Sequence, residues 1–416
     1  MRRFAGYRCS QCGHEYSPED VTYLCPKDNG VLDVVLNYPA IKKSTKPSEV
    51  QASTDFSIWR YLPLLPISDP GYAGTPLRAV GWTPVFTPNK LARKLNLRQL
   101  WIKDESRNPT ASFKDRASAV VVARAREIKA AVVVTASTGN AGAALAGMAA
   151  AAEVSAVIFA PKTAPPAKVA QLLVYGSQVL LVDGSYDDAV ELSRQAADEF
   201  GWYCRNTGYN PFTAEGKKTA AFEIWEQVLA AENLERPLCV FIPVGDGNII
   251  AGIHKGFKDL HHLGWLERMP RIFGVQAEGS AAIANAYEAR AEVITAVRAD
   301  TLADSISVNL PSDGMRALHA ATQTGGSYIK VSDTQILTAI AELGRYGIFS
   351  EPAAAAAFAG LRKALESGLI GAGDPVLVLN TGSGLKDVNA ARKAVAEAAV
   401  IEPTMEALRL ALEVIH

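Results

Sequence analysis

Short apolar segments alternate with helical segments from residue 83 onward, and this alternation limits the possible fold more than any other feature. Continuous apolar strands are typical of parallel sheets that helices cover on both faces. The expected strands are 100–104, 131–135, 154–159, 178–182, 202–205, 239–243, 271–276 and 376–379. The expected helices are 117–130, a segment ending at 152, 168–175, 187–199, 214–231 and 249–260. The pattern predicts an α/β fold, in which ligands bind where strands end and helices begin.

Three turns rich in glycine and small polar residues follow expected strands, at 135–142, 243–249 and 380–384. Backbone N–H groups in such turns bind anions, and the following helix N-terminus favours negative charge. We interpret the second turn as a phosphate cradle made of backbone amides. It lacks the lysine of a nucleoside triphosphate loop, so a nucleoside triphosphate site is not indicated. We expect the carboxylate of Asp246 to point away from that phosphate. Each turn alone is also common as a simple bend.

Lys114 lies in the segment 108–116, directly before an expected helix. A primary amine at such a place can form a Schiff base with an aldehyde cofactor such as pyridoxal 5'-phosphate (PLP). It can equally be a solvated lysine in the first turn of a helix. The three turns favour the reactive amine, because they would supply a phosphate cradle, a carboxylate site and the Thr381 hydroxyl for a pyridine nitrogen. We therefore predict that Lys114 is catalytic.

These motifs, in this order at strand ends, resemble those of the fold-type II PLP-dependent enzymes, the tryptophan synthase β family. The residues that carry the resemblance are Ser112–Arg116, Ser137–Asn140, Gly245–Asn248, Glu351–Ala354 and Thr381–Asp387. Within the family the motifs are most similar to those of the threonine synthases. The resemblance implies two open parallel-sheet α/β domains with PLP between them. An inner small domain would span about 115–215, and the rest of the body (83–400) would form the larger domain. The resemblance also implies a homodimer.

The resemblance assigns roles to single residues. Lys114 would hold PLP and transfer protons, and Phe113 would pack near the ring. The other expected cofactor contacts are Asn140, Gly245, Asp246, Gly247, Asn248 and Thr381. The expected substrate contacts are Ser137, Thr138, Gly139, Asn140, Lys168 and Asn206. The implied reaction is a PLP-dependent lyase reaction of threonine biosynthesis, which converts O-phospho-L-homoserine and water to L-threonine and phosphate.

Two segments differ from the threonine synthase pattern and leave other substrates open. The segment 182–188 has Ser185 and Tyr186 where asparagine and an aromatic residue often occur, and 303–311 is similar to a run of the threonine dehydratases. Asn210 and Lys217 are further candidates for contacts to a substrate phosphate. The alternative functions are a serine/threonine ammonia-lyase, a β-replacement enzyme such as cysteate synthase, or a binding protein on the same scaffold that does not use PLP.

Residues 1–38 contain two cysteine-containing turns that resemble a zinc ribbon. The predicted metal ligands are Cys9, Cys12, Cys25 and Asp28. Asp28 stands where a fourth cysteine is usual, and His14 could replace it as a ligand. The same pattern also fits a ribbon that has lost its metal and persists by packing.

The remaining segments carry less information. Residues 39–82 are rich in proline and predict a linker that wraps onto the body, with a short helix near 58–63. Residues 401–416 predict a C-terminal helix that either caps the body or contributes to a dimer contact. The formal net charge of -1 argues against nucleic acid or an anionic membrane as a partner. No apolar run is long enough to span a membrane. We therefore expect a cytoplasmic enzyme that acts on a small amino acid.

Overall fold

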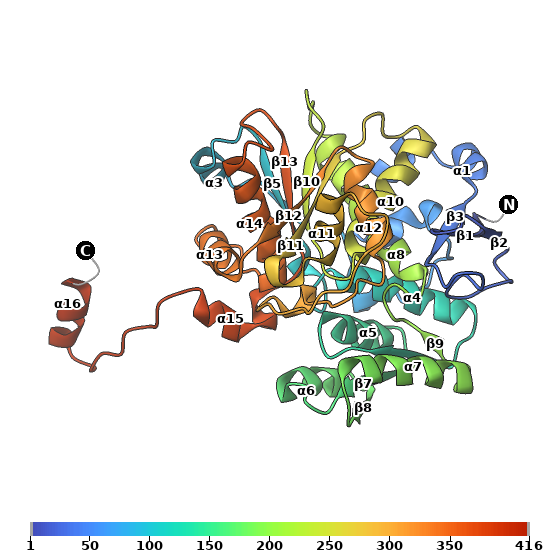
Figure 1. Ribbon diagram of the computed structural model, residues 1–416, viewed down its shortest axis with the longest axis horizontal. Helices are drawn as coiled ribbons and strands as arrows, with labels where there is room; N and C mark the ends of the chain where they lie inside the picture. The colour runs from blue at the N-terminus through green and yellow to red at the C-terminus, as the bar shows by residue number, and fades with distance from the viewer. Residues whose placement is uncertain (1–2, 414–416) are drawn as a thin grey trace.

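The computed structural model describes residues 3–413, and its centre is a six-stranded sheet (Figure 1). The strand order is β12-β11-β10-β13-β5-β4. The strands are β4 (Val85–Phe86), β5 (Leu100–Asp104), β10 (Cys239–Pro243), β11 (Arg271–Ala277), β12 (Ser327–Val331) and β13 (Val376–Asn380). Neighbouring strands are parallel except at the edge, where β4 runs antiparallel to β5. The predicted parallel α/β arrangement is confirmed for this sheet.

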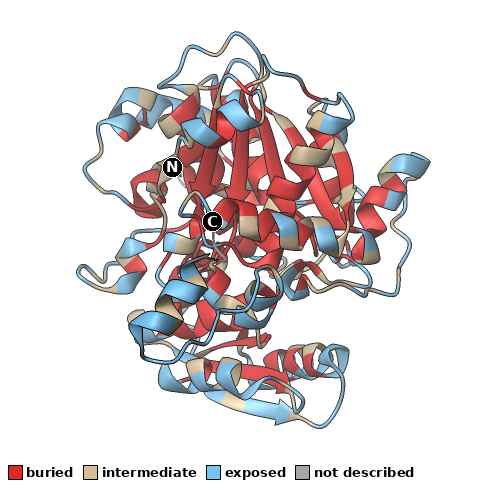
Figure 2. Cartoon of the chain, turned by 90° about the vertical axis from the view of Figure 1, so that its left-hand side faces the viewer, coloured by how far each residue is buried: buried red, intermediate tan, exposed pale blue. Residues whose placement is uncertain are grey.

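A second sheet of four parallel strands has the order β8-β7-β6-β9. Its strands are β6 (Val132–Ala136), β7 (Ser155–Pro161), β8 (Gln178–Val182) and β9 (Tyr203–Cys204). Helices α5 (Asn140–Ala151), α6 (Pro166–Val174) and α7 (Tyr186–Phe200) follow β6, β7 and β8 in turn. Figure 2 shows that most strands of both sheets are buried, whereas β8 at the edge of the smaller sheet is largely exposed.

Helix α8 (Phe212–Lys217) packs closely against both α4 (Lys114–Glu127) and α10 (Asn248–Leu263). Glycine permits the close approach, because a Cβ atom at Gly216 would lie 2.0 Å from the carbonyl oxygen of Arg116. The single helix expected over 214–231 is divided into α8, α9 (Thr219–Ile224) and a π-helical turn at Trp225–Leu229. Lys218, between α8 and α9, keeps right-handed helical dihedral angles, so the chain continues in the same direction.

Several elements around the larger sheet were not predicted from the sequence. Besides β12, they are the helices α3 (Asn89–Lys94), α11 (Ala282–Ala289), α12 (Gly314–Thr322), α13 (Asp333–Gly344) and α14 (Pro352–Glu366). Helix α14 contacts β10, β11, β12 and β13, and its alanine-rich surface lets it lie close to the sheet.

The N-terminal segment forms a three-stranded antiparallel sheet in the order β2-β1-β3. Its strands are β1 (Phe4–Cys9), β2 (Glu15–Tyr16) and β3 (Leu32–Leu36). The predicted linker contains short helices, namely α1 (Tyr38–Ser44), α2 (Pro47–Gln51) and the 3-10 helices Ile58–Leu64 and Pro76–Ala79. Trp59 and Tyr61 of this segment are buried in the same core as the catalytic body, so the segment packs onto the body along its length.

The C-terminal region leaves the body after α15 (Val388–Lys393) and ends in α16 (Met405–Glu413), which lies away from both sheets (Figure 1). Helix α16 begins at 405 rather than 401, because Pro403 precedes it and the Thr404 side chain accepts the N–H of Ala407 at 3.2 Å. Residues 414–416 of the predicted helix lie outside the described part of the chain. Within residues 3–413, no helix is long and apolar enough to cross a membrane.

Candidate active site

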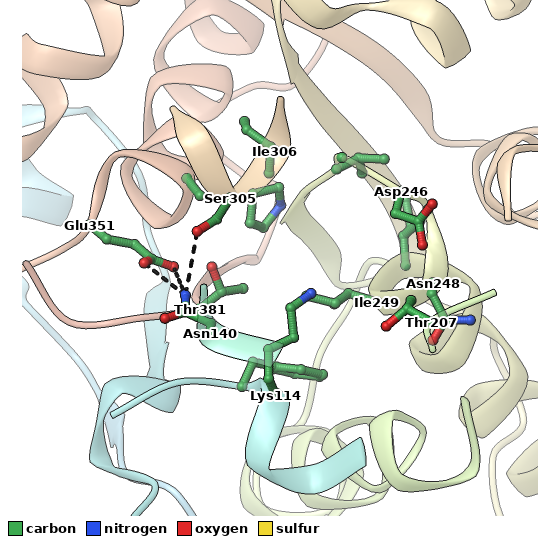
Figure 3. A pocket seen from close by; sticks show the side chains of 17 residues that line it. Lys114, Asn140, Thr207, Asp246, Asn248, Ile249, Ser305, Ile306, Glu351 and Thr381 are labelled. Carbon is green, nitrogen blue, oxygen red and sulfur yellow. Dashed lines mark hydrogen bonds between the residues drawn. The ribbon is translucent and has the colours of Figure 1, made fainter. Parts of the chain in front are cut away.

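A cavity lies at the carboxyl ends of β10 and β13, between the lobes built on the larger and the smaller sheet (Figure 3). Its lining includes Phe113, Lys114, Asn140, Thr207, Gly245, Asp246, Gly247, Asn248, Ser305, Ile306, Glu351 and Thr381. A second cavity adjoins it and shares Asn140, Ser305, Glu351 and Ala353. Every residue predicted to contact the cofactor therefore lines one cavity.

Lys114 is the first residue of α4, and its amine extends into the cavity (Figure 3). The backbone N–H of Phe113 donates to the carbonyl oxygen of Thr381 at 2.8 Å, which joins the start of α4 to the end of β13. Burial, followed by the nearby Arg205 guanidinium, lowers the pKa of Lys114 to about 8. The neutral, nucleophilic amine is therefore accessible near neutral pH.

The two residues after Lys114 anchor the first turn of α4. The buried Arg116 guanidinium forms ion pairs with Glu105 and Glu223, with a distance of 2.7 Å from Nε to Glu105 Oε2. Asp115 accepts the backbone N–H of Thr110 at 2.6 Å. Removing one partner from such a buried ion pair leaves an uncompensated charge, which costs several kcal/mol, about 3–5. The run Lys-Asp-Arg thus places one side chain in the cavity and uses the next two to fix its position.

The turn between β10 and α10, which the sequence predicts to be a phosphate cradle, requires glycine at two positions. Gly247 has φ +90°, and a Cβ at Gly245 would lie 2.7 Å from the Cα of Ile306, so both positions favour glycine. Ser312 donates to the Asp246 carboxylate through its N–H at 2.8 Å and its hydroxyl at 2.6 Å. Helix α10, 16 residues long, begins at Asn248 and directs its N-terminus to this turn.

Asn140, the first residue of α5, and Glu351, which directly precedes α14, meet at one side of the cavity (Figure 3). The Asn140 Nδ2 donates to both carboxylate oxygens of Glu351, at 3.0 and 2.9 Å. Burial raises the pKa of Glu351. Glu351 was not predicted as a site residue, although the motif Glu351–Ala354 is one of those that carry the family resemblance. Thr381, at the end of β13, completes this side of the cavity.

Unlike the predicted cofactor contacts, the predicted substrate contacts do not all line one cavity. Thr138, Gly139 and Lys168 line the second cavity, where Lys168 pairs with Asp304 at 2.8 Å. Ser137 is buried and accepts the N–H of Gly139 at 3.2 Å.

Asn206 is not among the residues that line either cavity. Its side chain accepts from the Thr135 hydroxyl at 2.9 Å and from the N–H of Ala136 at 3.0 Å, and it donates to Ser193. In this structure Asn206 therefore supports the end of β6. Asn210 has a similar supporting position, because its amide donates to the carbonyl oxygen of Cys204.

The four predicted metal ligands form a cluster beside β1. The ligand atoms of Cys9, Cys12, Cys25 and Asp28 all lie within 4.8 Å of one another. A Cβ at Gly30 would lie 2.6 Å from the Cys9 sulfur, so glycine there keeps room for the cluster. Three thiolates and a carboxylate are a donor set that Zn²⁺ accepts in a tetrahedral site. His14 is outside the cluster, and its Nδ1 lies 3.0 Å from the Lys27 amine.

Residues 77–382 match the family model described as pyridoxal-phosphate dependent enzyme. The chain belongs to this family. The match confirms the predicted family and the expectation of a PLP-dependent enzyme. A threonine synthase of Methanocaldococcus jannaschii is 36% identical over 409 residues, which cover 98% of this chain and 99% of that protein. A threonine synthase of Methanosarcina acetivorans is 37% identical, with 97% and 98% of the two chains covered.

A solved structure confirms the fold of this PLP-dependent enzyme. Threonine deaminase isoform 2 from Solanum lycopersicum, in its processed form, superimposes with a TM-score of 0.67 over 83% of this chain and 94% of that chain. The two are 24% identical, so this likeness establishes the fold alone. The cavity suits PLP by its chemical groups, since it combines an amine, a glycine-rich turn at a helix N-terminus and a hydroxyl.

Proposed function

We propose that this enzyme is a threonine synthase, which converts O-phospho-L-homoserine and water to L-threonine and phosphate. The observation that carries the proposal is the identity of 36–37% with threonine synthases over almost the full length of both chains. The cavity supports it, because Lys114 projects into a space bordered by a glycine-rich turn at the N-terminus of α10 and by the second cavity.

Different residues of the chain would bind different parts of the cofactor. Lys114 would bind the aldehyde carbon, the backbone of Gly245–Asn248 the phosphate, and the Thr381 hydroxyl the ring nitrogen. Asn140 would contact the ring hydroxyl, and Phe113 would pack beside the ring. When bound, PLP withdraws electrons from the substrate, so that protons on its Cα and Cβ become acidic. A neutral hydroxyl facing the ring nitrogen, rather than a carboxylate, moderates that withdrawal.

Lys114 is positioned to carry protons, because its lowered pKa permits both the neutral and the charged form near neutral pH. We propose that its amine removes the Cα and Cβ protons in turn and returns one proton to Cγ after phosphate has left it. Water then adds its hydroxyl at Cβ, its proton balances the released phosphate, and the Lys114 amine returns the last proton to Cα. The backbone of Ser137–Gly139, at the N-terminus of α5, would bind the substrate carboxylate. Lys168 would lie at the entrance, and Asn206 would hold the end of β6 in place.

Three incubations test this function. Purified enzyme supplied with PLP is expected to release phosphate and L-threonine from O-phospho-L-homoserine, and Lys114→Ala is expected to abolish both this release and the visible absorbance of bound cofactor. Lys162→Met, an exposed lysine in the smaller sheet's lobe, serves as the matched control. Ammonia and 2-oxobutyrate from L-threonine, or cysteate from phosphoserine with sulfite, without threonine from the first substrate, would overturn the proposal.

We also propose that Cys9, Cys12, Cys25 and Asp28 bind one Zn²⁺ ion that fixes the two turns of the N-terminal sheet. Support comes from the convergence of the four ligand atoms within 4.8 Å. The purified enzyme is expected to contain about one zinc per chain by mass spectrometry of metals. Cys12→Ser should reduce the zinc content strongly, whereas Cys239→Ser, a buried cysteine of β10, should leave it unchanged. Equal zinc contents in the two variants would contradict the site.

For its assembly and place in the cell, we propose a cytoplasmic homodimer, with catalytic lobes at about 115–215 and in the rest of the body. The dimer is supported by the C-terminal helix α16, which exposes Met405, Leu410 and Leu412 and packs on neither sheet. A free apolar helix face of this kind is characteristic of protein–protein contacts.

A further inference from the structure

We propose that Arg205 and Lys217 form a buried anion site that binds a phosphate monoester in the active-site cavity. Arg205 directly follows β9, and Lys217 is the last residue of α8, so two separate elements deliver the two cations. The proposal goes beyond the backbone cradle at Gly245–Asn248. It rests on the proposed function only where the substrate's own phosphate is considered.

Arg205 is buried without a carboxylate partner. Its side chain is 1% exposed, and its hydrogen bonds go to two hydroxyl groups, Ser118 at 3.2 Å and Thr207 at 2.9 Å. The second guanidinium nitrogen, Nη2, has no hydrogen-bond partner. Among residues 3–413, no carboxylate oxygen lies within 4.0 Å of this guanidinium. A buried donor left in this state is costly unless a ligand completes it.

In the described part of the chain, Lys217 is also buried without a carboxylate partner. Its side chain is fully buried, and its amine donates to the Asn248 Oδ1 at 2.5 Å. Burial lowers its pKa well below the ordinary value, and the neighbouring Lys114 and Arg205 add to this effect. An approaching anion would favour the charged form of this amine.

The other buried cations of the described chain differ from these two. Each has a carboxylate partner, as the pairs Arg60–Glu226, Lys103–Glu223, Arg116–Glu105, Lys218–Asp259, Lys255–Glu215 and Arg316–Asp313 show. The fold therefore compensates buried positive charge wherever no ligand is expected. Two buried basic groups without a carboxylate partner, both charged once an anion approaches, would match the charge of one phosphate monoester, about -2.

Both cations reach the cavity through residues that line it. Thr207 accepts from Arg205, Asn248 accepts from Lys217, and both acceptors belong to the cavity wall. Figure 3 shows Thr207 and Asn248 on the side of the cavity away from Glu351, next to the cradle. A phosphate there would accept from the unpartnered Nη2 of Arg205, and from the Lys217 amine once it turns away from Asn248.

The phosphate has two possible sources, and binding measurements separate them. We would titrate the apoprotein with PLP and with pyridoxal, which lacks the phosphate. We would also titrate the PLP-loaded enzyme with O-phospho-L-homoserine and with L-homoserine. The variants are Arg205→Gln and Lys217→Met, with Arg205→Lys as the conservative change and the exposed Lys162→Met as the control. Thermal unfolding checks that each variant folds.

If the site binds the cofactor phosphate, each variant should lose about 10- to 100-fold in affinity for PLP and keep its affinity for pyridoxal. If it binds the substrate phosphate, PLP affinity should persist, while affinity for O-phospho-L-homoserine falls by the same factor and that for L-homoserine does not. Arg205→Lys should recover part of either loss. Where Arg205→Gln fails to fold, Lys217→Met carries the same comparison.

Unchanged affinities for PLP, O-phospho-L-homoserine and competing inorganic phosphate in folded variants would overturn the site. The proposed function fails separately. An enzyme that binds O-phospho-L-homoserine through these cations but forms no threonine from it would keep the anion site and lose the synthase assignment.

Discussion

The amine of Lys114 is surrounded by groups that act on its charge in opposite directions. Burial and Arg205 disfavour the ammonium form, whereas Asp246 and Glu351 favour it, and the net effect is a pKa of about 8. Because Arg205 is the largest electrostatic cause of the lowering, the reactivity of Lys114 is tied to a residue outside its own motif. The titration of the lysine can therefore be changed without touching the lysine.

We predict that Arg205→Gln raises the pKa of Lys114, because a neighbouring cation that destabilises the ammonium form is removed. In the wild-type apoprotein, the rate of reaction with pyridoxal should rise with pH and reach half its maximum near pH 8. In the variant, this midpoint should move upward by about half to one pH unit. The visible absorbance of the product measures the rate, and Lys162→Met should keep the wild-type midpoint. A variant midpoint at or below the wild-type value would contradict this electrostatic account.

The residues that the sequence identified were those whose role follows from local position. Lys114, Asn140 and Thr381 each come directly after a strand or begin a helix, and parallel strands bring such positions to the same edge of a sheet. Glu351 meets Asn140 from 211 positions further along the chain. The significance of Arg205 comes from the absence of a partner. A contact between residues far apart in sequence and a missing carboxylate partner produce no local sequence pattern. Both features can therefore be recognised only in the folded chain.

At the scale of elements, close helix packing fixes the start of α4. We predict that Gly216→Ala destabilises the protein by about 1–3 kcal/mol, because the new methyl group would overlap the backbone of Arg116 and push α8 from α4. The same shift should weaken PLP binding by displacing Lys114. Urea unfolding and PLP titration measure the two effects. Gly344→Ala at the end of α13, where nothing lies within 4 Å, is the matched control and should be neutral or slightly stabilising. Equal stability of the two variants would argue against this packing constraint.

The alternation of strands and helices was predicted correctly because it depends on local hydrophobic pattern. The division of 214–231 into α8, α9 and a π-helical turn was not predicted. Its sequence contains no proline, and its one glycine, Gly216, lies inside α8. The buried ion pairs of Lys218 and the contacts of Gly216 shape this region, and both depend on elements distant in sequence.

At the scale of the whole molecule, the N-terminal segment that contains β1 to β3 contacts residues near the active-site cavity at two places. The Tyr23 hydroxyl accepts the backbone N–H of Cys204 at 2.8 Å, directly before Arg205. Asp33 of β3 pairs with Arg316, which binds Asp313, and Asp313 accepts from Asn248 at 2.6 Å. These polar contacts join the N-terminal segment to residues beside the proposed anion site.

The C-terminal helix α16 gives the last prediction. A nine-residue helix is marginal by itself in water, and the extended segment before it leaves its apolar residues exposed, so we expect a second copy of the chain to cover them. Light scattering should give twice the chain mass of 44.3 kDa for the full-length enzyme. The double change Leu410→Asp and Leu412→Asp should shift the equilibrium toward monomer at low concentration, because a charged face cannot be buried without cost. Val293→Asp, at an equally exposed apolar position on the body, should leave the mass unchanged. A wild-type monomer, or a double variant that dimerises as tightly as the wild type, would show that α16 does not hold two copies together.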